Sequence, residues 1–137
     1  MARKPKAMVL DSWSVLAYLE DEPAGSQVAD IIADAHESDT PLMMTVVNAG
    51  EIWYIVARET SEDEADRTIL ELAQLGIQFS DADWKLAREA ARFKPKGKIS
   101  FADCFAAALA KENKADLATG DSEFKQVENE VKILWLP

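Results

Sequence analysis

Four carboxylates in this sequence, Asp11, Glu51, Asp103 and Asp121, each follow or interrupt an apolar segment. If the fold gathers them in one cleft, they repel each other strongly unless a cation lies between them. Ligand sets made only of oxygen favour Mg²⁺ or Mn²⁺ over zinc or copper. Such an ion lowers the pKa of a bound water, directs it at a phosphorus atom and stabilises the departing oxygen. The four acids therefore point to the hydrolysis of a phosphodiester.

Asp11 ends an apolar run, residues 7–10, in which polar and apolar side chains do not alternate. Such a run is typical of a strand in the middle of a parallel sheet with both faces covered. Asp11 would then lie at the carboxyl edge of the sheet, where reacting groups gather in open α/β folds. The alternative is that Asp11 or Ser12 only caps the helix that follows, since both residue types are good caps.

Glu51 lies in an expected helix, residues 46–60, that is apolar nearly all round and should be deeply packed. No cation lies three or four positions before or after it on that helix. A buried carboxylate must be paired, protonated or bound to a metal. Asn48, one turn earlier, is the residue that we expect to hold Glu51 or to line the same pocket.

Asp103 is the only polar residue between Phe101 and Ala110, in an alanine-rich segment that predicts a helix lying close against the sheet. Ser100 as the N-cap, with Asp103 three positions later, resembles a capping pair. Capping favours Glu or Gln at that position, however, and Asp103 has no cation three or four residues away. A site role therefore competes with a capping role.

Asp121 repeats the arrangement of Asp11, because it follows a predicted strand, residues 115–119, and precedes a helical turn. Lys125, four positions later, offers a local ion pair as the alternative to a role in the site. Glu123, in the same turn, is expected to face elsewhere and to be exposed.

The elements that must position these acids alternate along the chain as short strands and helical segments. The expected strands are residues 7–10, 41–45, 77–79, 115–119 and 131–136, and the expected helices are 12–20, 24–36, 46–60, 61–75, 82–93 and 100–110. Crossovers between parallel strands are almost always right-handed, so successive helices cover both faces of the sheet. This predicts a three-layer α/β/α fold with a central, mostly parallel sheet, in which the strand-end acids share one edge.

The bulk composition bounds the class of protein. With 137 residues, 48% hydrophobic and 29% charged, we expect a single domain, residues 1–137. Cys104 is the only cysteine, which excludes an internal disulfide and a cysteine-rich zinc site. Too few apolar residues follow the basic start, residues 1–6, for a signal peptide, and no apolar run is long enough to span a bilayer. We expect a cytoplasmic protein that does not enter the membrane.

The net charge of −10 argues against a strong long-range attraction to nucleic acid. For the protein to bind nucleic acid, a local basic patch or bound cations would have to offset the negative electrostatic field of the chain. The candidates are a loop with three lysines and two arginines in the helix before it: Lys94, Lys96, Lys98, Arg88 and Arg92. The alternative for the loop is a solvated linker.

Taken in order, four motifs resemble those of the PIN-domain nucleases, and most closely the ribonuclease toxins of VapBC-type toxin–antitoxin modules. They are Leu10-Asp11-Ser12, Asn48-Ala49-Gly50-Glu51, Ser100-Phe101-Ala102-Asp103 and Thr119-Gly120-Asp121-Ser122-Glu123-Phe124. The resemblance implies a Mg²⁺- or Mn²⁺-dependent endoribonuclease with a three-layer fold, often a homodimer, held inactive by a cognate antitoxin. It implies that Asp11, Glu51, Asp103 and Asp121 coordinate the metal. Supporting polar groups would be Asn48, with Ser12 or Thr119.

Three other functions are open at this point. The first is a PIN-like module that binds RNA or a partner without cleaving anything, for which intact acids would be unnecessary. A nuclease of the 5′ type that acts on DNA shares the same acid cluster. A phosphatase of the haloacid dehalogenase type also begins with a strand-end Asp, but it needs a second Asp two residues later, where this chain has Trp13.

Overall fold

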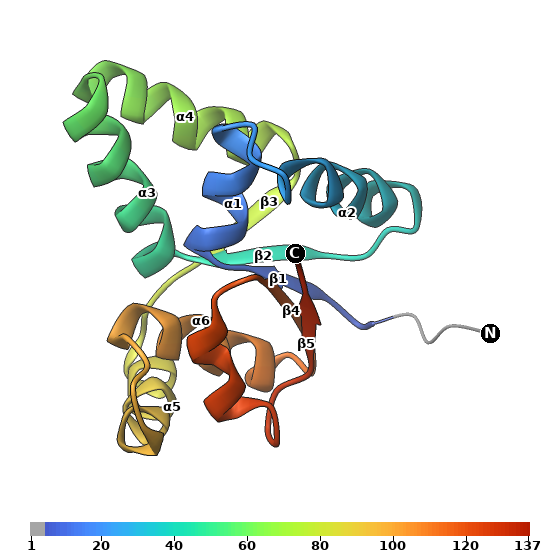
Figure 1. Cartoon of the computed structure of the whole chain (residues 1–137), viewed down its shortest axis with the longest axis vertical. Coiled ribbons are helices and arrows are strands. Elements are labelled where there is room, and N and C mark those ends of the chain that lie inside the picture. The colour runs from blue at the N-terminus through green and yellow to red at the C-terminus, as the bar shows by residue number, and fades with distance from the viewer. Residues whose placement is uncertain (1–4) are drawn as a thin grey trace.

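The computed structural model describes residues 5–137, which form a five-stranded sheet with helices on both faces (Figure 1). The strands are β1 (Met8–Leu10), β2 (Leu42–Thr45), β3 (Ile77–Ser80), β4 (Asp116–Thr119) and β5 (Ile133–Trp135). All strand pairs are parallel, and the order across the sheet is β3-β2-β1-β4-β5. The predicted three-layer α/β/α architecture is confirmed, and the last strand, β5, lies at an edge of the sheet.

Two groups of helices cover the two faces of the sheet (Figure 1). One group is α1 (Ser12–Leu19), α2 (Gly25–Glu37), α3 (Val46–Glu59) and α4 (Glu62–Gln74). The other group is α5 (Trp84–Phe93) and α6 (Phe101–Glu112), with the 3₁₀ turns η1 (Lys94–Lys96) and η2 (Ser122–Val127). Side chains of β1 alternate between the two cores: Val9 packs with α5 and α6, whereas Met8 and Leu10 pack toward the other group.

The connections leave β1 and β4 in opposite directions across the sheet. From β1 the chain steps to β2 and then β3 through α1 to α4, and it returns to β4 through α5 and α6 on the other face. Neighbouring strands β1 and β4 therefore form a switch point, where open α/β sheets leave a crevice at the carboxyl ends of their strands. Asp11 follows β1 and Asp121 follows β4, so both acids lie at this edge of the sheet.

The start of α5 differs from the sequence prediction. Asp83 is the N-cap: its side chain accepts the Leu86 N–H at 2.9 Å, and the helix begins at Trp84 and not at residue 82. Trp84, at the start of the helix, is 75% exposed, and Ala91 is also exposed. Because the helix begins two residues later than predicted, its first turn lies outside the core; the buried residues of α5 are Leu86, Ala90 and Phe93.

Helix α3 is also less buried than predicted. Its fully buried residues are Asn48, Ala49 and Ile52, whereas Tyr54 is 51% exposed. The helix packs against α4, α6, α1 and the strands β2 and β3, whereas Gly50, Tyr54 and Arg58 are exposed. The expectation of a deeply packed helix is therefore wrong for the outer half of α3.

Within the described residues, no helix combines the length and the apolar character needed to cross a bilayer. The basic start of the chain was part of the sequence argument against a signal peptide. Its residues 1–4 lie outside the described residues.

Two glycine substitutions test the packing. At Gly25 an added Cβ would lie 2.7 Å from the backbone oxygen of Ala17, so Gly25→Ala should lower the free energy of unfolding by about 1–3 kcal/mol. At Gly50, exposed within α3, an added Cβ meets nothing within 4 Å. Gly50→Ala should therefore raise the free energy of unfolding by about 0.5–1 kcal/mol. Urea denaturation of both variants measures the difference, and equal effects would contradict the close approach of α1 and α2.

Candidate metal centre

Asp11 is completely buried at the end of β1, and each of its carboxylate oxygens has a hydrogen-bond donor. Oδ1 accepts the backbone N–H of Ser14 at 2.9 Å, which makes Asp11 the N-cap of α1. Oδ2 accepts the hydroxyl of Thr119, at the end of β4, at 2.6 Å. Capping and a place in the site are therefore not alternatives, because one oxygen caps the helix and the other faces the neighbouring strand.

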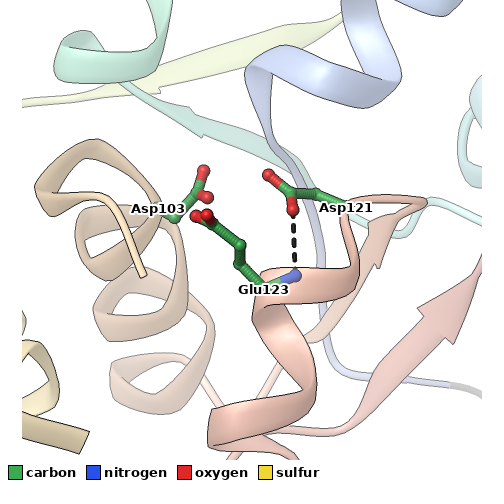
Figure 2. Close-up of side chains that lie close together, drawn as sticks. All are labelled: Asp103, Asp121 and Glu123. Carbon is green, nitrogen blue, oxygen red and sulfur yellow. Dashed lines mark hydrogen bonds between the residues drawn. The ribbon is translucent and has the colours of Figure 1, made fainter. Parts of the chain in front are cut away.

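Asp103, Asp121 and Glu123 bring one carboxylate oxygen each to within 4.8 Å of one another. Figure 2 shows Asp103 on α6 and the other two on the turn after β4, with the three carboxylates directed toward a common space. Asp121 Oδ1 accepts the Glu123 N–H at 2.9 Å and caps η2. The ion pair with Lys125 that the spacing allowed does not form in the described structure, so Asp121 faces the acids instead.

Glu51 is half-buried on α3 and is held by neutral donors. Its Oε1 accepts the Ser12 hydroxyl at 2.8 Å and the Asn48 amide at 3.1 Å. Asn48 also donates to the Ala102 carbonyl at 3.3 Å, and its own Oδ1 accepts from Thr45 at 2.6 Å. Asn48 thus connects α3 to the first turn of α6, one residue before Asp103.

The acids influence one another because they are buried close together. The pKa of Asp103 is raised to about 8, first by burial and then by the neighbouring carboxylates Asp121, Asp11 and Glu51, in that order. Burial likewise raises the pKa of Asp11 to about 6, against the opposing hydrogen bonds from Thr119 and Ser14. No lysine or arginine pairs with any of these acids in the described part of the chain, so their negative charge is left uncompensated.

This donor set fits a hard divalent cation. All the groups are carboxylate oxygens, and Asp103, only 6% exposed, has its pKa raised by like charges that a cation would neutralise. Neither the buried Cys104 nor any histidine belongs to the cluster of acids. Mg²⁺ or Mn²⁺ suits such oxygen ligands, whereas zinc and copper favour nitrogen and sulfur.

Glu123 is the residue that the sequence analysis missed. It was expected to face away and to be exposed, but it is half-buried beside Asp103 and Asp121. The reason is the 3₁₀ geometry of η2, which turns Glu123 toward the N-terminus of α6, whose Ser100 N–H it accepts at 3.2 Å. Its position two residues after a strand-end Asp was the available signal.

Two of the predicted nucleic-acid-binding cations are already in ion pairs. Arg92 pairs with Glu89 at 2.9 Å and with Glu130 at 2.7 Å, and Lys96 pairs with Glu130 at 2.8 Å. Lys111 joins the same network, at 2.7 Å from Glu130. Together these cations lower the pKa of Glu130 well below its ordinary range.

The other three predicted cations have different surroundings. Lys94 donates to the Ile99 carbonyl at 2.7 Å, which ties it to the loop that precedes α6. The side chains of Arg88 and Lys98 are exposed and form no ion pair with any described residue. These two are therefore the more available cations of the predicted set.

The chain belongs to the PIN domain family, because the PIN domain model matches residues 8–130. Its fold is similar to that of a chain in the VapBC2 structure from Rickettsia felis, solved with a fragment of promoter DNA. Here the TM-score is 0.72 at 14% identity, over 96% of this chain and 99% of that one. A chain of VapBC-1 from nontypeable Haemophilus influenzae gives a TM-score of 0.71 at 16% identity, over 94% and 97% of the two chains.

A third similar structure is VapC20 from Mycobacterium tuberculosis, described as a sarcin–ricin loop-cleaving toxin. The TM-score is 0.67 at 16% identity, and the alignment covers 88% of this chain and 95% of that one. A search of curated proteins gives no match. The predicted relationship to PIN domains is thus confirmed, and the fold is the one found in VapBC structures.

The stability of the metal-free protein should depend on the charge of Asp103. Between its ordinary pKa of 3.8 and the raised value of about 8, the folded state binds more protons than the unfolded state. The free energy of unfolding should therefore fall as the pH rises from about 4 to 8. Asp103→Asn should raise it by about 1–3 kcal/mol at pH 8 in EDTA and should flatten this pH dependence.

Thermal and urea denaturation at pH 5 and pH 8 measure this effect. Asp30→Asn, the same change at an exposed position on α2, is the matched control. It should alter the free energy of unfolding neither at pH 5 nor at pH 8. An Asp103→Asn protein that is less stable than the wild type at pH 8 would show that Asp103 mainly stabilises α6.

Proposed function

We propose that this protein is a Mg²⁺- or Mn²⁺-dependent endoribonuclease and the toxin of a toxin–antitoxin pair. The observation that carries the proposal is the cluster of Asp103, Asp121 and Glu123, whose carboxylate oxygens lie within 4.8 Å of one another. Asp11 and Glu51 lie outside that cluster but are near enough for their charges to raise the pKa of Asp103. Membership of the PIN domain family and the fold shared with VapBC structures support it. RNA as the substrate rests on the resemblance to ribonuclease toxins.

The proposed roles follow from the contacts of each residue. Asp11, Glu51, Asp103 and Asp121 would hold the metal through their carboxylates. Thr119 fixes the orientation of Asp11, and Ser12 and Asn48 fix that of Glu51. When bound, the divalent cation supplies a more acidic water and stabilises the charge on the leaving oxygen of the phosphodiester.

The arrangement favours catalysis over simple binding. Acids that raise each other's pKa destabilise the metal-free fold. A module that bound a partner without catalysing a reaction would be more stable without these acids. A nuclease that acts on DNA would need the same acids. A direct comparison of RNA with DNA of the same sequence therefore separates these two substrates.

A surface hollow of about 260 Å³ between α1, α3 and α4 supports the proposal of a protein partner. Apolar side chains of Leu16, Leu19 and Val56 line it together with four acids, Glu20, Glu59, Glu64 and Glu71. Burial, and then the neighbouring carboxylates Glu22 and Glu59, raise the pKa of Glu20 on this rim. A cognate antitoxin with an apolar and basic segment would complement this surface. Separately, we propose that the toxin forms a homodimer.

Cleavage of RNA by the purified, partner-free protein is the first test. We expect cleavage with Mn²⁺, its loss in EDTA and its return when Mn²⁺ is restored, with little cleavage of the matching DNA. Asp11→Asn, Glu51→Gln and Asp103→Asn should each reduce the rate at least about 100-fold while the circular dichroism spectrum is unchanged. Asp30→Asn should cleave like the wild type. Cleavage that persists in EDTA would contradict a metal-dependent site.

The lysine loop is tested by RNA affinity in the inactive Asp103→Asn background. Replacing Lys94, Lys96 and Lys98 together by Gln should weaken binding and reduce its dependence on salt. Lys98→Gln alone should lower the salt slope by about one unit, and Lys96→Gln should lower it less because Glu130 already neutralises Lys96. Lys132→Gln, at another exposed lysine, is the control. An unchanged slope in the triple variant would exclude the loop from the RNA surface.

A further inference from the structure

The N-terminus of α6 has half of a capping box on its own helix. Ser100 is the N-cap, and its hydroxyl accepts the backbone N–H of Asp103 at 3.1 Å. In a complete capping box, the side chain at the position of Asp103 would accept the backbone N–H of Ser100 in return. Here the Ser100 N–H donates instead to Glu123 Oε1, at 3.2 Å, from the turn after β4.

Glu123 is well placed to replace Asp103 in this role. Its backbone N–H is fixed by Asp121 at 2.9 Å, so its side chain starts from the turn that carries the neighbouring acid. The Gln126 side chain donates to the carbonyl of Glu123 at 3.2 Å and also to the carbonyl of Lys98. The turn η2 therefore contacts the segment leading into α6 at two points, Lys98 and Ser100.

We propose that Glu123 is a positioning residue that completes the capping box of α6 and thereby leaves the Asp103 carboxylate free for the metal centre. The inference rests on the proposed function, since it assigns a role toward the metal to Asp103. The same contact joins the two segments that carry Asp103 and Asp121, and so it fixes the separation of these carboxylates. Without it, the Asp103 side chain is the acceptor that a capping box would offer to the Ser100 N–H.

The test separates the hydrogen bond of Glu123 from its charge. Glu123→Gln keeps an acceptor oxygen for the Ser100 N–H and removes the charge, whereas Glu123→Ala removes both. We expect the Gln variant to bind Mn²⁺ within about threefold of the wild type, and the Ala variant to bind at least about tenfold more weakly. Glu128→Ala, the same truncation at an exposed position just after η2, is the control and should bind Mn²⁺ like the wild type.

Mn²⁺ affinity, measured by titration calorimetry, is the primary result, and RNA cleavage and thermal stability are recorded alongside it. Equal losses of affinity in the Gln and Ala variants would overturn the inference, because the charge of Glu123 would then be what the metal needs. Lower stability of the Ala variant with unchanged Mn²⁺ affinity would also overturn it, leaving a structural cap alone. A wild-type protein that binds Mn²⁺ without cleaving RNA would overturn the proposed function and not the role of Glu123.

Discussion

Repulsion between carboxylates that the fold holds together is the constraint on which the rest of this structure depends. Asp11 and Asp103 are buried beside other acids, and both have raised pKa values. The groups that orient the acids are neutral: the hydroxyls of Thr119 and Ser12 and the amide of Asn48. Neutral donors fix geometry without cancelling charge, so the negative potential of the cluster is kept for a cation. A lysine in the same place would have stabilised the fold and neutralised the site.

The topology makes this concentration of charge possible. The sheet reverses its direction of winding between β1 and β4, and the strand-end acids therefore lie at the same edge of the sheet. Helix starts bring in the remaining groups, because α3 and α6 both begin near that edge of the sheet (Figure 1). Asp11 and Asp121 also cap the segments that follow them. These caps fix the backbone beside the acids. In the role proposed above, Glu123 likewise caps α6 from a turn that carries one of the acids.

The distribution of charge outside the site sets a second constraint. The chain has a net charge of −10, and Glu130 takes up three of the cations that a polyanion would use, Arg92, Lys96 and Lys111. Exposed cations such as Lys98 and Arg88, together with the bound metal, would then provide the attraction for RNA. The acidic rim between α1, α3 and α4 suits a basic protein segment better than a nucleic acid. The two kinds of partner would thus meet different faces of the molecule.

The sequence by itself determined the order of strands and helices and indicated the four candidate acids, because apolar runs that a carboxylate follows or interrupts are local patterns. It also indicated the contact of Asn48 with Glu51, which lie one helical turn apart. Only the tertiary structure decided the position of Glu123 and the pairing of Arg92 with Glu130, since each depends on contacts between segments more than 20 residues apart. The exposure of Trp84 likewise followed from where Asp83 caps α5. Local propensity specifies elements, whereas the direction of a turn and the choice of an ion-pair partner are set by what the fold places beside them.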